Sequence, residues 1–248
     1  MTVDLWYTLV YQRPEERRRY ERGRRAAWDA ALRRAGVGPR EAARWARAVD
    51  RRGSLGGLAT IEDRIRWLER QVGCRVDGDV LRRSLDRVAE TARIQVVPGA
   101  KRFLHGAASR GIPVGLLSNI THESPAAIRR LLDRTDLARF LSVVALSNET
   151  RLAKPDPAAF RALWRRLGVR GASTIHVGDT AADVDGARRS NAQVWLFVGA
   201  SRWAPRRDRL LRSDHPPEVP RFSSWEQVSD RLFGAPRRER PEARPGRR

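Results

Sequence analysis

Four short segments of the chain each end an apolar run with polar side chains that can do chemistry. They are Thr2-Val3-Asp4, Leu116-Leu117-Ser118-Asn119, Ala153-Lys154-Pro155-Asp156 and Gly178-Asp179-Thr180-Ala181-Ala182-Asp183. The set offers a carboxylate nucleophile, hydroxyl and amide hydrogen-bonding groups, an ammonium and two further carboxylates. The carboxyl ends of strands in an open parallel sheet meet at one crevice. We therefore expect these side chains to converge on one site.

Phosphoryl transfer is a reaction that this set can support, because it needs a nucleophile and neutralisation of charge on the phosphoryl oxygens. Asp4 can attack once water is excluded and a cation screens the repulsion between two anions. Lys154 can bridge Asp4 and the phosphoryl group and keep the nucleophile ionised. The hydroxyl of Ser118 and the backbone amide of Asn119 can hydrogen-bond the phosphoryl oxygens.

The last of the four segments carries two acids with the chemistry of metal ligands. Asp179 ends an apolar run and Asp183 falls just inside the next predicted helix. Both can reach the crevice, directly or through water, as hard oxygen ligands for Mg²⁺. Asp183 has a second interpretation as an acid that caps the helix N-terminus, and that alternative stays open. An acid at a buried strand end, such as Asp179, needs a partner.

The elements that must position these residues follow from the hydrophobic pattern. Apolar residues recur at helical spacing within residues 12–94, and after Val96 short apolar runs alternate with helical patterns. We expect helices at 14–34, from Pro39 onward, around 61–72, 80–88, 98–110, 155–167 and 222–233, and strands at 113–117, 142–146, 174–177 and 193–197. This alternation predicts an α/β fold with a doubly wound parallel sheet and an inserted α-helical unit.

The four segments, in this order, resemble the four motifs of the haloacid dehalogenase superfamily, whose members mostly hydrolyse phosphoesters through an aspartyl-phosphate. The resemblance implies a Rossmann-like core at 1–11 and 95–233 and a helical cap at 12–94 that chooses the substrate. It also implies Mg²⁺ held by Asp4, Asp179, Asp183 and the backbone carbonyl of Trp6. Thr8 resembles the residue that fixes the first loop beside the substrate, although plain turn chemistry accounts for it equally well.

The chain departs from the family's phosphatases at Trp6. Those enzymes usually carry a second aspartate there, which protonates the leaving oxygen and then activates water, and indole can do neither. General acid–base help is worth roughly 10²–10⁴-fold. Haloacid dehalogenases have an aromatic residue at this position and displace halide, which needs no proton. They also work without a metal and carry small hydroxyl and amide residues where this chain has Asp179 and Asp183.

The mixed pattern leaves three hypotheses, which we rank. We favour a Mg²⁺-dependent phosphatase that acts on a small phosphorylated metabolite through an aspartyl-phosphate on Asp4. The first alternative is a 2-haloacid dehalogenase-like hydrolase with Asp4 as nucleophile, although Phe160 stands where such enzymes usually have tyrosine. The further alternative is a catalytically weak binding domain.

The formal net charge of +21 invites a nucleic-acid hypothesis, which we do not favour. Of the 50 basic residues only Lys101 and Lys154 are lysine, a bias that indicates genome composition rather than one partner. A small anionic substrate gains from the same field. Because ammonium is a compact point charge, a lysine retained at position 154 indicates that geometry matters there.

Other features of the sequence bear on where the protein resides and on how its two ends are organised. No apolar run is long enough to span a bilayer, the first residues do not read as a signal peptide, and the single cysteine, Cys74, fits a reducing cytoplasm. Residues 234–248 lack apolar anchors and predict a disordered basic tail. The first strand is short for the family, so either this edge is clipped or the true start lies upstream. The oligomeric state cannot be read from the sequence.

Aromatic and basic residues in the helical segment have both a structural and a functional interpretation. We favour a core role for Trp28, Trp45 and Trp67 over a ligand platform, because each falls on the apolar side of a helical repeat. Arg13, Arg17 and Arg18 have two interpretations, contact with an anionic substrate or a solvated helix face, and we favour the solvated face.

Overall fold

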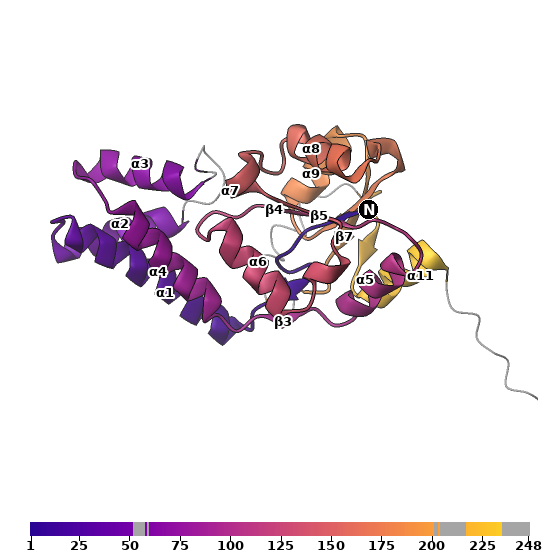
Figure 1. The fold of residues 1–248 in the computed structure, drawn as a ribbon, viewed down its shortest axis with the longest axis horizontal. Coiled ribbons are helices and arrows are strands. Elements are labelled where there is room, and N and C mark those ends of the chain that lie inside the picture. The colour runs from indigo at the N-terminus through magenta and orange to yellow at the C-terminus, as the bar shows by residue number, and fades with distance from the viewer. Residues whose placement is uncertain (52–57, 59, 201–202, 204–216, 235–248) are drawn as a thin grey trace, which may run out of the picture.

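The main sheet lies between two layers of helices in one part of the molecule (Figure 1). A computed structural model describes residues 1–51, 58, 60–200, 203 and 217–234. The sheet contains β1 (Thr2–Val3), β4 (Gly115–Ser118), β5 (Val143–Leu146), β6 (Ile175–Gly178), β7 (Gln193–Phe197) and β8 (Arg221–Phe222). Its six strands are all parallel, in the order β5-β4-β1-β6-β7-β8. The predicted α/β parallel sheet is therefore confirmed, and its order reverses at β1, where ligands bind in such sheets.

Helices cover both faces of the sheet (Figure 1). One face carries α8 (Pro157–Leu167) and α9 (Ala181–Arg189), and the other carries α5 (Ala100–Ala108), α6 (Pro125–Arg134) and α11 (Trp225–Phe233). Short helical turns occupy α7 (Ser147–Thr150), Ala138–Phe140 and Gly171–Ser173. Successive residues of a strand point to opposite faces, so Leu116 and Leu117 enter the two different apolar clusters. Burial of both faces is what requires the strands to be continuously apolar.

A second group of helices lies beside the sheet and has its own apolar core. It contains α1 (Pro14–Arg34), α2 (Pro39–Arg51), α3 (Ile61–Val72) and α4 (Gly78–Glu90). Proline in the first turn of α1, together with acidic residues there and arginines in its last turn, favours the helix and complements its dipole. Trp28 is fully buried in this core, and Trp45 and Trp67 pack at its edge. Among the described helices, none combines the length and apolar character needed to cross a membrane.

The chain enters and leaves this helical group through a small antiparallel ribbon. β2 (Val10–Tyr11) pairs with β3 (Gln95–Val96), so the two connections run side by side. Strands of two residues are too short to produce a periodic signal, and the sequence did not predict the ribbon.

Several predicted boundaries were wrong because turns decide them. Helix α5 begins at Ala100 rather than at residue 98, since Gly99 precedes it with a left-handed φ of 82°. The closing helix begins at Trp225, after β8, where the Ser224 side chain accepts a hydrogen bond from the Gln227 amide. Helix α6 was not predicted. Of the expected disordered tail, residues 235–248 lie outside the described residues.

Candidate active site

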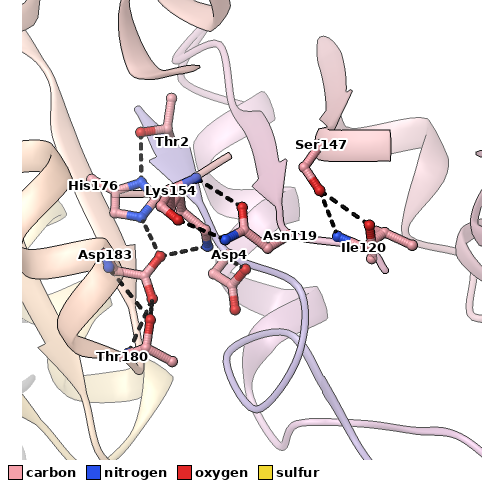
Figure 2. A network of polar contacts seen from close by, with 9 residues as sticks. All are labelled: Thr2, Asp4, Asn119, Ile120, Ser147, Lys154, His176, Thr180 and Asp183. Atoms are coloured by element: carbon pink, nitrogen blue, oxygen red, sulfur yellow. Dashed lines mark hydrogen bonds and ion pairs between the residues drawn. The ribbon is translucent and has the colours of Figure 1, made fainter. Parts of the chain in front are cut away.

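All four polar segments meet at the carboxyl edge of the sheet. Asp4 directly follows β1, and Figure 2 shows its carboxylate beside Lys154 and Asp183. The Lys154 ammonium donates to Asp4 Oδ1 at 2.6 Å and to Asp183 Oδ1 at 2.5 Å. The three residues are only 6%, 5% and 0% exposed. A buried ammonium therefore joins two carboxylates that lie far apart in the sequence.

Burial and charge act in opposite directions on these three groups. Burial raises the pKa of Asp4, and the Asp183 carboxylate adds to that rise, while Lys154 lowers it; the net direction is upward. Burial also acts to raise the pKa of Asp183, but Lys154 and His176 outweigh it and hold this pKa well below its usual range. The pKa of Lys154 is raised: burial lowers it, but both carboxylates raise it more. Lys154 is thus a permanent cation at neutral pH.

Both oxygens of Asp183 have partners. Oδ2 accepts from the Thr180 amide at 3.0 Å and from the Thr180 hydroxyl, which completes a capping box at the start of α9. Oδ1 contacts Lys154 and lies 2.9 Å from His176 Nε2. Asp183 therefore caps α9, which is one of the two roles that the sequence allowed for it. The same carboxylate also accepts a hydrogen bond from Lys154.

His176 continues this network toward β1. The ring is fully buried, and its Nδ1 lies 3.0 Å from the Thr2 hydroxyl while its Nε2 faces Asp183 (Figure 2). Contacts at both ring nitrogens fix the orientation of the imidazole. His176 therefore connects the strand that carries Asp4 with the acid that holds Lys154.

A glycine allows Asp183 to approach the strand end. A Cβ placed on Gly178 would lie 2.2 Å from Asp183 Cγ, which no real contact permits. Glycine at this position follows from a close approach of side chain and backbone rather than from a turn.

Asn119 does not present its side chain to the crevice in the way a phosphoryl-binding group would. Its Nδ2 donates to the Lys154 carbonyl at 2.8 Å, and its Oδ1 accepts from the Lys154 amide at 2.9 Å. This pair of hydrogen bonds fixes the backbone of the lysine. The side chain of Asn119 thus holds the backbone of Lys154 in place. Only the backbone amide of Asn119 is left for the predicted hydrogen bond to a phosphoryl oxygen.

Ser118 and Thr8 have buried hydroxyl groups at the same edge of the sheet. Ser118 is 1% exposed and Thr8 is fully buried. Within the described part of the chain, neither hydroxyl oxygen has a hydrogen-bond partner. The Thr8 carbonyl accepts from Trp225 Nε1 at 2.9 Å, which fixes this loop. Because unpaired buried hydroxyls are uncommon, both are available to bind oxygens of a ligand.

The donor set fits a hard divalent cation. One carboxylate oxygen from each of Asp4, Asp179 and Asp183 lies within 4.8 Å of the others, and all three residues are buried. Three carboxylates next to one ammonium leave an excess of negative charge, which burial makes unfavourable without a further cation. Carboxylate oxygens are the ligands that Mg²⁺ prefers. Trp6 lies two residues beyond Asp4, with its ring 6.5 Å from that of Tyr20.

A polar cavity of about 290 Å³ opens next to Trp6 and Asn119, and the sequence did not predict it. Its far wall comes from the polar face of α1, including Arg17, Tyr20 and Arg24. Helical periodicity assigns such a face to solvent. Tyr20, an aromatic residue inside a run of charged residues, was the one sequence signal that this face is covered.

Comparisons with known proteins place the chain in a family. The model of the haloacid dehalogenase-like hydrolase family matches residues 5–191. Phosphatase MT3486 of Mycobacterium tuberculosis is 33% identical over 135 residues, which cover 54% of this chain and 60% of that protein. The phosphoserine phosphatase of Thermus thermophilus is 34% identical over 133 residues, or 53% and 48%. The matched regions thus span about half the length of these relatives.

Solved structures of the family have the same fold. A HAD phosphatase from Thermococcus onnurineus has a TM-score of 0.64 at 18% identity, covering 94% of this chain and 97% of that one. A 2-haloacid dehalogenase from Pseudomonas syringae pv. Tomato DC3000 has a TM-score of 0.65 at 19% identity, with 94% and 96% covered. The chain belongs to the haloacid dehalogenase-like hydrolase family.

Proposed function

We propose that this hydrolase is a Mg²⁺-dependent phosphatase that acts on a small phosphorylated metabolite through an aspartyl-phosphate on Asp4. The observation that carries the proposal is the buried Asp4 carboxylate, 2.6 Å from the Lys154 ammonium and grouped with two further carboxylates. A nucleophile next to one fixed cation and a set of hard oxygen ligands is what phosphoryl transfer requires.

In this mechanism Asp4 attacks phosphorus, the ester P–O bond breaks, and the leaving oxygen departs with the bonding electrons and takes a proton from water to become the alcohol. Lys154 neutralises charge on both the carboxylate and the phosphoryl oxygens, because its ammonium is held in place by Asp183 and its backbone by Asn119. The unpaired hydroxyls of Ser118 and Thr8 donate to phosphoryl oxygens. Water then hydrolyses the aspartyl-phosphate and regenerates Asp4.

Asp4, Asp179 and the backbone carbonyl of Trp6 are the residues that would hold Mg²⁺, with Asp183 close by. When bound, the ion supplies positive charge to the phosphoryl oxygens and to the nucleophile. Since both oxygens of Asp183 already have partners, Asp183 orients Lys154 and would reach a bound Mg²⁺ only through water.

Helices α1 to α4 serve as the cap in this proposal, inserted over residues 12–94 between two parts of the core at 1–11 and 95–233. Their separate apolar core supports this division, as does the ribbon through which the chain enters and leaves. The side of α1 that lines the cavity next to Trp6 would contact the leaving group.

One observation favours a second function, 2-haloacid dehalogenation. Trp6 cannot protonate a leaving oxygen, and halide needs no proton. The three clustered carboxylates favour the phosphatase, because they suit a metal that a dehalogenase does not use. The names of the relatives, which include phosphoserine and phosphoglycolate phosphatases, support the same choice.

The test is turnover of p-nitrophenyl phosphate by the purified protein with Mg²⁺. Asp4→Asn should lower kcat at least about 1,000-fold, because it removes the nucleophile, and Asp133→Asn, an exposed aspartate on α6, should leave it unchanged. Exhaustive chelation should abolish activity and added Mg²⁺ should restore it. Activity that survives chelation, together with chloride release from 2-chloropropionate, would assign the dehalogenase function instead.

A further inference from the structure

The cavity beside Trp6 lies where the leaving group of the proposed reaction would emerge. Trp6 follows Asp4 by two residues, and Asn119, which also lines the cavity, holds the backbone of Lys154. The opposite wall belongs to α1. An inference about its occupant therefore rests on the proposed function and names the kind of alcohol that leaves.

Both arginines of the described lining are paired with carboxylates, although the whole chain carries a net charge of +21. Arg24 lies 3.0 Å from Asp50 and 4.0 Å from Glu123. Burial lowers the pKa of Arg24, but these two carboxylates outweigh it and the pKa is raised. Arg17 lies 3.7 Å from Glu21. A second anionic group on a substrate would meet Glu21 and Glu123 as well as arginines that already have partners.

Two buried donors in the lining of the cavity make no hydrogen bond among the described residues. Gln12 is 3% exposed and lines the cavity, and within the described residues its side-chain nitrogen Nε2 has no hydrogen-bond partner. Arg17 Nε is also buried, and although it lies 3.7 Å from Glu21 Oε1 as an ion pair, it makes no hydrogen bond among the described residues. Burying a donor without an acceptor is unfavourable, and an oxygen of the ligand that accepts from it removes that penalty.

A hydroxyl group matches this combination better than a charged group does. Hydroxyl groups can both accept, from Gln12 and Arg17, and donate, to Glu21 or Glu123, whereas an ammonium only donates and a carboxylate only accepts. The tilted rings of Trp6 and Tyr20, with centroids 6.5 Å apart, add apolar surface for the carbons of the ligand. The volume of about 290 Å³ falls at the lower edge of small-molecule sites, so the ligand is short.

We propose that this cavity binds an uncharged, polyhydroxylated leaving group, which makes the substrate the monophosphate ester of a short polyol or sugar, with Gln12 as a specificity-determining residue. A substrate that brings several hydroxyls to this cavity can accept hydrogen bonds from Gln12 and Arg17 and donate hydrogen bonds to the two glutamates at the same time.

The test compares three phosphate esters with the same three-carbon skeleton: glycerol 3-phosphate, n-propyl phosphate and 3-phosphoglycerate. With Mg²⁺ present, kcat/KM for glycerol 3-phosphate should exceed each of the others by about tenfold, the discrimination given by one or two hydrogen bonds. Equal or better turnover of n-propyl phosphate or 3-phosphoglycerate would overturn the inference. p-Nitrophenyl phosphate reports the chemistry separately: if it is hydrolysed while the series fails, only this inference fails, and if no ester is hydrolysed the proposed function fails too.

Two variants of Gln12 test the residue itself. Gln12→Leu removes the amide at similar size, and Gln12→Glu replaces its donor by an acceptor. Each should reduce the ratio of kcat/KM between glycerol 3-phosphate and n-propyl phosphate about tenfold. Arg22→Ala, an exposed residue on α1, is the control and should leave the ratio unchanged. The ratio is compared in whichever Gln12 variant has a normal melting curve, and an unchanged ratio there would refute the role of Gln12.

Discussion

Replacing Lys154 by methionine removes the one ammonium that bridges two buried carboxylates. In the wild-type protein Lys154 lies 2.6 Å from Asp4 and 2.5 Å from Asp183, and all three side chains are at most 8% exposed. Methionine preserves much of the length of the side chain but leaves both carboxylates without their cation. Breaking a buried ion pair in this way costs about 3–5 kcal/mol. For a chain of this size each kcal/mol lowers Tm by roughly 2–4 °C, so Tm should fall by roughly 6–20 °C.

The pH dependence follows from the carboxylates. In the wild type the pKa of Asp183 is depressed below 3.8, so its contribution to the free energy of unfolding is present above that pH and is lost as pH falls through the folded-state value. Without Lys154, burial and mutual repulsion raise the pKa of Asp4 and Asp183 in the folded variant. The variant then gains stability by protonation as pH falls. The difference between the two proteins should therefore be largest near pH 8 and become smaller toward pH 4.

The assay is thermal and urea unfolding of both proteins in metal-free buffer from pH 4 to pH 8. The control is Lys101→Met at the other lysine of the chain, which pairs with Asp136 at 3.1 Å while both side chains are 46% exposed. An exposed pair of this kind contributes at most about 1 kcal/mol. If Lys154→Met unfolded no more easily than Lys101→Met, or if its deficit were the same at every pH, the account of a shared buried ammonium would be refuted.

Three further substitutions test how the site is positioned. Gly178→Ala places a Cβ against Asp183 and should therefore lower Tm and reduce kcat about tenfold. The control is Gly38→Ala, because the space around Gly38 is open. Equal Tm and kcat in the two variants would contradict the close approach of Asp183 to Gly178. His176→Asn breaks the contacts to Thr2 and Asp183 and should lower kcat about tenfold with little change in KM. A change in KM alone would argue that His176 does not position the site. Trp6→Asp should raise turnover of alkyl phosphates by about 10²-fold, and no gain would show that an acid of the cavity already supplies the proton.

The polar segments could be predicted because each is a local pattern. An apolar run followed by a carboxylate or a hydroxyl marks a strand end, and parallel strands place such ends at one edge. Helix α1 was predicted with its observed bounds, since Pro14 fixes its start and Gly36 follows its end. Helix α5 and the last helix were misplaced because the conformations of Gly99 and of residues 221–222 depend on contacts that the sequence does not display.

The contact between Lys154 and Asp4 was predicted, but other contacts between distant segments could not be predicted. Asp183 was identified as either a metal ligand or a cap, but its contact with Lys154 depends on the positions of two different loops. The pairing of Arg24 with Asp50 and Glu123 joins α1 to α2 and to the loop after β4, so periodicity along one helix could not reveal it. Gln12 directly follows the two-residue strand β2, and nothing in the local sequence predicted that its polar side chain is buried.

The central position of β1 has a consequence for biosynthesis. Its two residues pair on both sides with β4 and β6, and the Asp4 amide donates to the Val177 carbonyl, so this strand has no complete set of partners until residue 177 exists. At translation rates of roughly 5–20 residues per second, that interval lasts roughly 10–35 s. Asp4 is therefore fixed in its site late, after the helices encoded in between have had time to fold.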